Sequence, residues 1–467
     1  MKKLFLYNLI LGLFVSCSTH QPSDEIPLLS NAGNDASCVF LTNDDSGNPV
    51  VSWAETDSAG GKYFYFSFWN GAEGRFDEKM NIPIPQNTSI HDEGMPKIAF
   101  KADGTMIATF ETSVPVPGSK WGKGDIEYST SADRGKTWTK PASVQAAYPY
   151  EGSINYSGIV RLDDGELGMA WLGTNTGGVA GRPVLFAKTT SEGAFTRAIL
   201  VDSAACECCR ISLSTDHKGG VNVVFRDLLP GSVRDISIVR SEDNGLTFSR
   251  TASFSKDHWV VEGCPDNGPA VTGNANGTYA AWYAGSSANK SGGLFYAVVD
   301  GNNNTTKRLL TPDGKFIQLC LMPDGTRIAG YNESYRENDS IYNRIVIGKI
   351  DNNGYFYKVA TPPGSRGFYP VVASAGKEQV IIAWKDNKRV FYRAVAVAEI
   401  NTELPEDGFE FSKWSNDAGR KVEVSNDTDP ACGMKLIGQM ARDTVMKEGN
   451  IIGFCSPKCR KKYTEAL

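Results

Sequence analysis

One unit of sequence recurs seven times along this chain. Each copy has an alternating apolar run, a glycine-containing turn, a second run that ends in an aromatic residue, and a third run. The turn glycines are Gly47, Gly104, Gly165, Gly219, Gly277, Gly325 and Gly376. The aromatic residues, spaced 49 to 61 residues apart, are Trp53, Phe110, Trp171, Phe225, Trp282, Tyr331 and Trp384. Runs with a period of two on either side of such turns predict antiparallel β-hairpins.

Seven such units predict a β-propeller. A propeller buries each small sheet against its neighbours, so every repeat depends on the next one for its stability. The near-regular spacing favours this fold over an irregular β-sandwich. We therefore expect an all-β, seven-bladed propeller over residues 36–400. The seventh unit lacks an outer strand before Asn401, and Glu25–Leu29 is the segment expected to supply it and close the ring.

The N-terminus predicts export and a lipid anchor. Lys2 and Lys3 precede an apolar stretch, Leu4–Val15, that is too short to span a bilayer and suits the core of a signal peptide. The stretch runs into Leu13–Cys17, which resembles a bacterial lipobox. The resemblance implies a lipoprotein signal peptide over residues 1–17, with lipid attachment at Cys17. The alternative is an ordinary cleaved signal with an incidental cysteine.

The anchor sets the expected location. Residues 18–24 are polar and contain proline and serine, so a tether is expected over residues 18–35. The protein is then expected in the bacterial cell envelope, outside the cytoplasm, with its lipid as the only contact with the membrane. The formal net charge is −5, and no basic cluster precedes the last dozen residues. Nucleic-acid-binding proteins need a concentrated positive surface, so no nucleic-acid partner is expected.

Two of the units carry a more specific motif. Ser131–Trp138 reads Ser-Ala-Asp-Arg-Gly-Lys-Thr-Trp, and Ser241–Phe248 is a close variant of it. Both resemble the Asp-box, a hairpin between the third and fourth strands of a blade, and Thr190–Phe195 is similar to a worn copy. The chain therefore resembles the Asp-box, or BNR, propellers over residues 36–400, and sialidases are the best-known members. The aspartate and glycine of the box shape a turn, so the box implies structure and not catalysis.

The sialidase resemblance does not extend to the catalytic residues. Sialidases have six blades, bind the substrate carboxylate with three arginines, and use a Tyr–Glu pair and an aspartate. Met95–Ile98 stands where an Arg-Ile-Pro motif is expected, and Tyr369 has no assignable glutamate partner. Arginines that occur near strand ends are Arg210, Arg226, Arg234 and Arg366. We therefore assign no catalytic residue, and a six-bladed, sialidase-like glycoside hydrolase (an exo-α-sialidase) remains the alternative fold and function.

The C-terminus resembles a second family. Asp429–Met434 reads Asp-Pro-Ala-Cys-Gly-Met, and Phe454–Cys459 reads Phe-Cys-Ser-Pro-Lys-Cys. Both motifs are similar to those of YHS domains, which are metal modules. The resemblance implies a small α+β domain over residues 428–467, joined to the propeller by a charged linker, residues 401–427. About 40 residues bury too little surface to fold unaided, so a bound metal is expected to hold the module together.

Three cysteines are the expected metal ligands of this module. Cys455 and Cys459 are spaced to present two thiolates to one point, and Cys432 supplies a third. Met434 as a fourth ligand would suit copper(I), whereas a nitrogen or hard ligand would suit zinc. One soft metal ion, copper or zinc, is therefore the expected cofactor. The alternative is a Cys455–Cys459 disulfide with Cys432 free, which an extracytoplasmic location permits.

A second cysteine cluster precedes two inner strands of the propeller. Its members are Cys206, Cys208, Cys209 and Cys264, and the same topology brings His91 to them. Loops before inner strands converge on one mouth of the channel, where Asp92, Glu93, Tyr156 and Arg366 are also expected. The cluster suits a soft-metal or redox site, or else one or two disulfides, with Cys206 or Cys208 paired to Cys264. Cys38 and Cys320 lie inside apolar runs and are expected to be core residues.

Together these patterns predict a lipid-anchored, metal-binding propeller protein. The favoured function is copper or zinc handling outside the cytoplasm, with the propeller as a scaffold. An envelope protein or a glycan at the propeller face is the further partner expected. Besides the glycoside hydrolase, a pure interaction protein with a structural metal remains open.

Overall fold

The computed structural model describes most of the propeller and parts of the C-terminal region. It covers residues 26–403, apart from 119–121, 147–151, 175–179, 286–291, 302, 304, 338–339, 353, 355 and 361–366. Beyond these it covers residues 426, 428–431, 443–447, 450–454 and 462–464. The predicted signal peptide with Cys17 lies outside the described residues, and so do Arg366, Cys432, Met434, Cys455 and Cys459. Within the described part, no helix is both long and apolar enough to cross a membrane.

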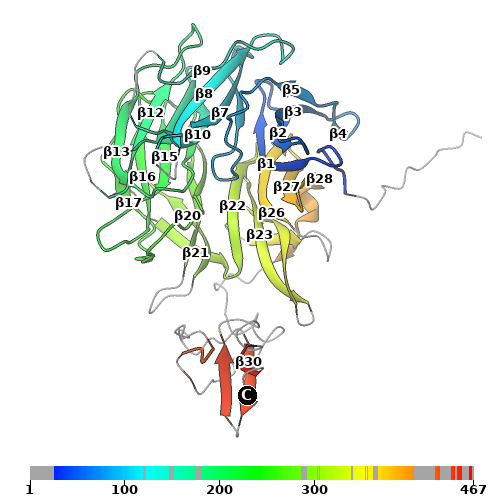
Figure 1. Cartoon of the computed structure of the whole chain (residues 1–467), viewed down its shortest axis with the longest axis vertical. Coiled ribbons are helices and arrows are strands. Elements are labelled where there is room, and N and C mark those ends of the chain that lie inside the picture. Colours follow the sequence, from blue (N-terminus) through cyan, green and yellow to red (C-terminus); the bar gives the residue numbers. More distant parts are fainter. Residues whose placement is uncertain are drawn as a thin grey trace, which may run out of the picture.

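The described strands form seven antiparallel sheets around a ring, and an eighth, two-stranded one (Figure 1). The first sheet contains β1 (Asp35–Asn43), β2 (Pro49–Thr56), β3 (Lys62–Asn70), β4 (Arg75–Phe76) and β5 (Met80–Ile82). The second contains β6 (Lys97–Phe100), β7 (Met106–Val114), β8 (Lys123–Ser131) and β9 (Ala142–Ser143). The third contains β10 (Asn155–Arg161), β11 (Leu167–Leu172), β12 (Arg182–Lys188) and β13 (Ile199–Ala205). The fourth contains β14 (Ser212–Thr215), β15 (Val221–Arg226), β16 (Ile236–Ser241) and β17 (Ala252–Ser253).

Three further sheets complete the ring. The fifth contains β18 (Ala270–Asn274), β19 (Gly277–Ala284), β20 (Gly293–Val299) and β21 (Thr305–Thr311). The sixth contains β22 (Gly314–Leu321), β23 (Arg327–Glu337), β24 (Ser340–Ile350), β25 (Phe356–Ala360) and β29 (Thr402–Glu403). The seventh contains β26 (Phe368–Ala375), β27 (Gln379–Asp386) and β28 (Arg389–Ala396), followed by the short 3-10 helix η1 (Val397–Glu399). β29 carries the sixth sheet to Glu403, beyond the expected limit at residue 400.

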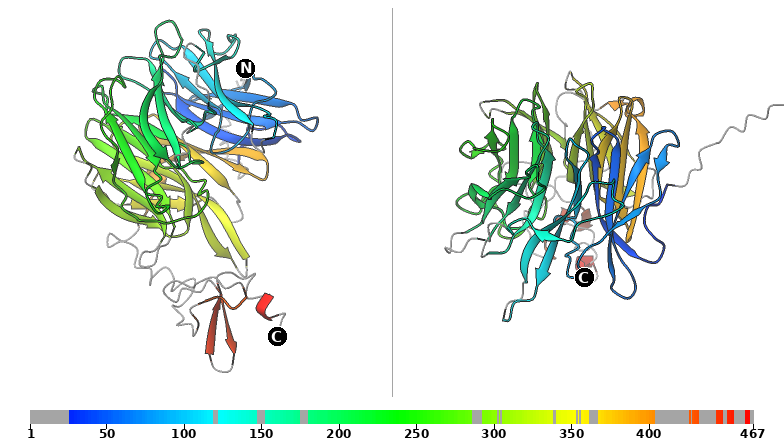
Figure 2. Two further views of the ribbon diagram at one scale, coloured as in Figure 1. Left: turned by 60° about the vertical axis from the view of Figure 1, so that its left-hand side comes forward. Right: turned by 90° about the horizontal axis from the view of Figure 1, so that it is seen from above.

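The seven sheets are arranged around a ring (Figure 2), and seven apolar clusters join them in order. Each cluster combines residues of two successive sheets, and the last combines the seventh sheet with the first. In that last cluster, Ile381 and Ala383 of β27 pack with Val51 and Trp53 of β2. Burial between neighbouring sheets is the main stabilising term of a propeller. The clusters therefore confirm the all-β, seven-bladed architecture, and the six-bladed alternative is wrong.

The seven repeated aromatic residues occupy one equivalent position. Each lies in the second strand of its sheet, as the repeat unit predicts, and the structure shows that each is almost completely buried. Six of the seven turn glycines have positive φ, between 78° and 90°, which favours glycine. Gly277 is the exception, because it starts β19 and pairs with Asn274 across a tight turn. The sequence pattern placed this glycine in the turn itself, and the register shows that it lies at the end of the turn.

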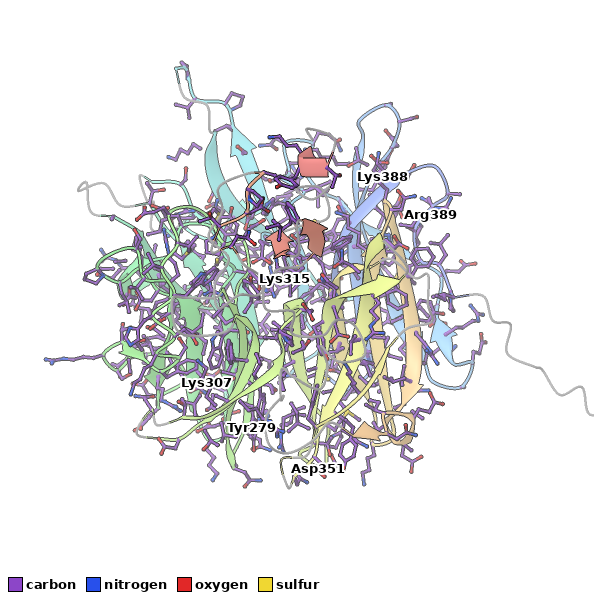
Figure 3. All side chains as sticks on the ribbon, turned by 90° about the horizontal axis from the view of Figure 1, so that it is seen from below. Tyr279, Lys307, Lys315, Asp351, Lys388 and Arg389 are labelled. Atoms are coloured by element: carbon purple, nitrogen blue, oxygen red, sulfur yellow. A yellow bond between two sulfur atoms is a disulfide. The ribbon has the colours of Figure 1, made fainter. Side chains whose placement is uncertain are left out.

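An N-terminal segment closes the ring. Leu28 forms an antiparallel bridge with Phe391 of β28, and the Leu29 N–H donates to the Val390 carbonyl at 2.9 Å. This is the position at which the sequence lacks an outer strand. At the rim, the Lys388 Nζ lies 2.7 Å from the Asp35 Oδ2 and so links the seventh sheet to the first (Figure 3).

The two Asp-boxes have the same hydrogen bonds. In the first box, the Asp133 carboxylate accepts from the Ser131 hydroxyl at 2.8 Å and the Thr137 N–H at 2.9 Å. In the second, Asp243 accepts from Ser241 at 2.7 Å and from the Thr247 N–H at 2.9 Å. The aromatic residues that end the boxes pack across to the preceding sheet, Trp138 on Phe66 and Phe248 on Phe186. The boxes are therefore structural turns that also join neighbouring sheets.

The described C-terminal residues form a small hairpin. β30 (Asp443–Lys447) pairs with β31 (Asn450–Phe454), drawn in red in Figure 1, and residues 462–464 are helical. The Phe454 ring lies 5.2 Å from the Tyr463 ring, measured between ring centroids. The three cysteines of the predicted module lie outside the described residues.

Candidate functional site

An open cavity of about 570 Å3 lies within the ring, towards the end at which the inner strands finish. It is lined by the later residues of the inner strands, which are the first strands of the seven sheets, and most of the lining side chains are apolar. Cys320 of β22 lies in this lining and is half-buried, whereas Cys38 is fully buried. The ring has two different ends. We call the end at which the inner strands begin the mouth, and the end at which they finish the far end.

Glu93 is the centre of the mouth. It is 0 % exposed, and its carboxylate accepts the N–H of Gly268 at 3.0 Å and the N–H of Arg210 at 3.2 Å. The Arg210 guanidinium also pairs with this carboxylate and donates to the Ile317 carbonyl at 3.1 Å. Four segments from different sheets therefore meet at one ion pair. A buried pair with all these hydrogen bonds is tolerated in an interior, but loss of either partner is costly.

Two of the arginines considered from the sequence are occupied by protein acceptors. Arg210 is held by Glu93 and Ile317, as described above. The buried guanidinium of Arg226 donates to the Asn267 carbonyl at 2.9 Å, the Arg234 carbonyl at 2.8 Å and the Tyr283 carbonyl at 2.7 Å. Neither arginine presents an exposed pair of guanidinium N–H groups, which is what binds a substrate carboxylate. The three-arginine site that a sialidase would use is therefore not assembled from Arg210 and Arg226.

Arg234 differs from these two. Its side chain is also buried, at 6 % exposed, yet its Nε and Nη1 have no hydrogen-bond partner among the described residues. It lies close enough to Cys206 to influence the charge of that thiol. A buried guanidinium with unused N–H groups favours an anion beside it, because an unpaired buried charge is unstable.

Four inner strands carry a bulge at the mouth. The register of β1, β10, β22 and β26 shifts by one residue near the start of each strand. At each shift one residue adopts φ between 51° and 58°, namely Cys38, Tyr156, Phe316 and Tyr369. None of these is a glycine, so the conformation costs energy, and bulges of this kind redirect side chains next to functional sites.

The bulges bring aromatic rings beside acidic groups. The ring centroids of Phe316 and Tyr369 are 4.1 Å apart, and those of His91 and Tyr156 are 5.9 Å apart. Burial raises the pKa of the Tyr369 hydroxyl, and the carboxylates of Glu93, Asp92 and Asp266 raise it further. All three aromatic residues of the bulges are half-buried, so part of each ring faces solvent.

Two aspartates of the mouth have different environments. Burial raises the pKa of Asp266, and the nearby charge of Glu93 adds to the effect. Asp92 accepts the Cys38 N–H at 2.9 Å and lies 2.7 Å from the Lys385 Nζ, so it is fixed in an ion pair. Two carboxyl groups in different environments, one with a raised pKa and one in an ion pair, are typical of sites for acid–base chemistry.

A second buried pair lies beneath the mouth. Burial lowers the pKa of Lys97 and raises that of Glu111, and each opposes the other's shift through its charge. The Glu111 carboxylate accepts the N–H of Tyr156, so it holds the bulged residue from behind. The Lys97 ammonium donates to the Met95 carbonyl at 2.8 Å. Lys97 belongs to Met95–Ile98, the segment that comes nearest in sequence to the Arg-Ile-Pro motif.

The cysteine cluster is partly oxidised. Cys208 and Cys264 form a disulfide, one of the pairings that the sequence left open, and it joins the loops before β14 and β18. Cys206 and Cys209 are free thiols whose sulfur atoms are 3.7 Å apart. The Cys209 thiol, as hydrogen-bond partner, lowers the pKa of Cys206, and Arg234 and Arg226 contribute to the lowering. Burial raises the pKa of Cys209.

The structure brings together only part of the cysteine and histidine cluster that the sequence predicted. Among the described residues, Cys206, Cys208 and Cys209 are the group whose sulfurs lie within 4.8 Å of one another. That group includes neither His91, which contacts Tyr156, nor Cys264. Because Cys208 is in a disulfide, two thiols remain, fewer than the three or four protein ligands of a zinc site. Arg366 lies outside the described residues.

Sequence reasoning missed several residues of the mouth. Phe316, Asp266, Lys97 and Glu111 were not identified, although all lie near the start of inner strands or the end of second strands. Glu111 follows the repeated aromatic residue Phe110, and a charged residue inside a buried strand was the available signal. The bulges had no signal in the hydrophobic pattern, because one inserted residue hardly disturbs a short alternating run.

Comparisons with known proteins agree with this architecture. Residues 69–284 match the BNR repeat-like domain family. No curated protein matches the chain. Among solved structures, the ulvan lyase of polysaccharide lyase family PL25, bound to a GlcA–Rha3S unit, is similar with a TM-score of 0.50 and 10 % identity, over 81 % of this chain and 99 % of that one.

Two sialidase-type structures are also similar. The intramolecular trans-sialidase from Ruminococcus gnavus has a TM-score of 0.48 and 10 % identity, over 82 % of this chain and 98 % of that one. The NanB sialidase from Streptococcus pneumoniae has a TM-score of 0.45 and 8 % identity, over 80 % and 71 % respectively. At such identities the likeness concerns the fold alone. Residues 69–284 thus match the BNR repeat-like domain family, and the described strands form a seven-bladed β-propeller.

Proposed function

We propose that this protein binds a carbohydrate at the mouth of its propeller and acts on it by acid–base chemistry. The observation that carries the proposal is the set of bulges that directs Tyr156, Phe316 and Tyr369 to the same end of the ring as Asp266 and Asp92. Half-buried aromatic rings offer flat apolar faces with little conformational freedom to lose, which suits the apolar faces of sugar rings. Carboxyl groups accept and donate the hydrogen bonds of sugar hydroxyls.

The two aspartates have complementary roles in the proposed reaction. Asp266 keeps its proton to higher pH than an ordinary aspartate, so it suits the donation of a proton to a leaving oxygen. Asp92, paired with Lys385, suits the acceptance of a proton. Glu93 is fully buried and holds Arg210 and Gly268, so it is a positioning residue for the loops that carry these groups.

The nature of the sugar follows from the arginines. Arg210 and Arg226 are saturated by protein acceptors, so they are not free to bind the carboxylate of sialic acid. Glycans without sialic acid are therefore the favoured ligands, and an exo-α-sialidase activity is the narrower alternative. A fluorogenic sialoside and a panel of neutral and uronic-acid glycans, each incubated with the wild type and Asp266→Asn, test both.

The expected result is cleavage of at least one non-sialylated glycan, and a loss of at least about 100-fold in rate in Asp266→Asn, because removal of a general acid typically costs this much. Asp163→Asn at the far end is the matched control and should retain full activity. Cleavage of the sialoside alone would establish the narrower alternative. Cleavage that survives unchanged in Asp266→Asn would refute the assigned role.

A second function, soft-metal binding, is favoured by contacts in the C-terminal region. The Gly453 N–H donates to the Asn426 Oδ1 at 2.7 Å, and the Asn426 Nδ2 donates back to the Gly453 carbonyl at 2.9 Å. The buried Asp429 accepts the Ala431 N–H at 2.8 Å, and the Lys462 Nζ lies 3.5 Å from the Ala431 carbonyl. These contacts join the segments that immediately flank the three cysteines of the predicted module.

We propose that this module holds one soft metal ion, copper ahead of zinc, through Cys432, Cys455 and Cys459, with Met434 as a further ligand. Contact between the flanking segments supports convergence of the three thiols, and soft thiolate and thioether ligands suit copper(I). The purified full-length chain should contain about one equivalent of metal, and Cys432→Ser should lose it while Cys320→Ser retains it. Equal metal content in both variants would contradict this site.

We also propose that Cys17 carries a lipid that anchors the chain outside the cytoplasm. The support is the lipobox beside an apolar signal core, and a disulfide in the propeller suits an oxidising compartment. Cells fed labelled palmitate should label the wild type, and Cys17→Ala should remove the label entirely. Label that persists in Cys17→Ala would refute the anchor.

A further inference from the structure

Four cysteines at the mouth are arranged as a chain of sulfur atoms. Cys206 and Cys209 are 3.7 Å apart, and each also lies within 4.8 Å of the sulfur of Cys208, which is bonded to Cys264. Cys206 and Cys209 are 1 % and 3 % exposed, whereas Cys264 is exposed. One end of the chain is therefore buried in the propeller, and the other faces solvent.

The buried end is built to stabilise a thiolate. The Cys206 N–H is held by the Arg226 carbonyl at 2.8 Å, so the residue is fixed at the end of β13. The unused N–H groups of the buried Arg234 lie in its surroundings, and the Cys209 thiol is its hydrogen-bond partner. A thiolate rather than a thiol is the nucleophile in disulfide exchange, so Cys206 is the attacking group.

We propose that these residues form a thiol–disulfide relay, in which the Cys208–Cys264 disulfide exchanges with the buried Cys206 and Cys209 thiols and releases Cys264 as an exposed thiol. This activity is independent of the glycan and metal functions proposed above. It gives a role to the buried Cys206 and Cys209 thiols and to Arg234, whose Nε and Nη1 have no hydrogen-bond partner among the described residues. The proposed acid–base site uses none of these groups. The species that reacts at Cys264 is a thiol or disulfide of a small molecule or protein outside the cytoplasm.

The relay proceeds in two balanced steps. The Cys206 thiol loses its proton, and the thiolate attacks the sulfur of Cys208. A Cys206–Cys208 bond forms and the Cys208–Cys264 bond breaks, so Cys264 leaves with the electron pair and takes up the proton that Cys206 lost. The Cys209 thiol then transfers its proton to Cys208 as its sulfur attacks Cys206. A Cys206–Cys209 bond forms and the Cys206–Cys208 bond breaks, with its electron pair going to Cys208. One disulfide and two thiols are present before and after, so no external oxidant or reductant is consumed.

The exchange can be measured on the full-length protein without reductant. A maleimide that is too bulky to enter the core traps Cys264 once the disulfide opens. Trypsin then yields residues 198–210, which contain Cys206, Cys208 and Cys209, and residues 257–290, which contain Cys264. Before exchange these peptides are joined by a disulfide. After exchange, residues 257–290 carry the label and residues 198–210 carry an internal disulfide.

We expect the wild type to accumulate label at Cys264 together with an internal Cys206–Cys209 disulfide. In Cys206→Ser the labelling of Cys264 should slow by at least about tenfold, because the attacking thiolate is gone. Cys320→Ser, which removes a thiol outside the cluster, should label like the wild type. The account is overturned if Cys264 in the wild type stays unlabelled without reductant, or if Cys206→Ser labels at the wild-type rate. The measurement on the wild type is informative even if a variant fails to fold.

Discussion

The two ends of the ring are built in different ways. At the far end, the hydrogen bonds of the Asp-boxes join residues two to four positions apart, as between Asp133 and Thr137. At the mouth, they join residues of different repeats, as between Glu93 and Arg210, which are 117 positions apart, and Lys385 and Asp92, which are 293 apart. The Asp-boxes are thus closed by hydrogen bonds within one turn, whereas the ion pairs of the mouth join different repeats.

This difference suggests a structural role for the Asp-boxes and a functional role for the mouth. The hydrogen bonds of an Asp-box serve its own hairpin, and its link to the preceding sheet is an aromatic contact. A network of buried charges and strained bulges is expensive to maintain, and such features gather at sites that bind or react. The motif that is most conspicuous in the sequence, the Asp-box, therefore lies at the end of the ring that we assign no chemistry.

The largest expected effect is the loss of the central ion pair. Glu93→Ala leaves the Arg210 charge buried and unpaired, and breaking such a pair costs about 3–5 kcal/mol in the free energy of unfolding. Asp163→Ala, which removes the partner of the exposed His217 at the far end, should cost less than about 1 kcal/mol. Urea denaturation of both variants measures the contrast. Similar losses in the two would abolish the distinction between the ends.

The acid role of Asp266 predicts a pH dependence. Its pKa is raised by burial, so the group is protonated below that pKa and loses its proton as the pH rises through it. Activity that needs the proton should therefore be retained at low pH and fall on the alkaline side, at a pH above the value of about 4 of an ordinary aspartate. The pH–rate profile of the wild type checks this. A rate that rises with pH across this range would assign Asp266 the opposite role.

The smallest effect is expected at the far end. Hydrogen bonds from Thr247, together with that from Ser241, lower the pKa of Asp243 to about 2. A depressed pKa contributes stability above the unfolded value of about 4, and this contribution disappears as the pH falls towards 2. Asp243→Asn should therefore lower the melting temperature slightly at pH 7 and have less effect near pH 2. A larger effect at pH 2 than at pH 7 would contradict the assignment.

The sequence predicted the structural features that each repeat forms on its own. The hydrophobic pattern predicted the second strands that contain Trp53 and the six equivalent aromatic residues. It also predicted that the segment containing Leu28 fills the gap in the last sheet. The pairing of Glu93 with Arg210 had no such signal, since it depends on how two distant loops meet. The bulge at Tyr369 was equally invisible, because a positive φ at a tyrosine is set by its surroundings and not by its propensity.

Binding of glycans tests most directly whether the mouth is the functional end. A glycan array should be probed with the full-length wild type, Tyr369→Ala and His91→Ala at the mouth, and His217→Ala at the far end as the matched histidine control. We predict that the wild type and His217→Ala bind the same glycan. Tyr369→Ala should bind it at least about tenfold more weakly, and His91→Ala more weakly than His217→Ala. Binding that is lost in His217→Ala and retained in Tyr369→Ala would place the site at the far end and contradict the account.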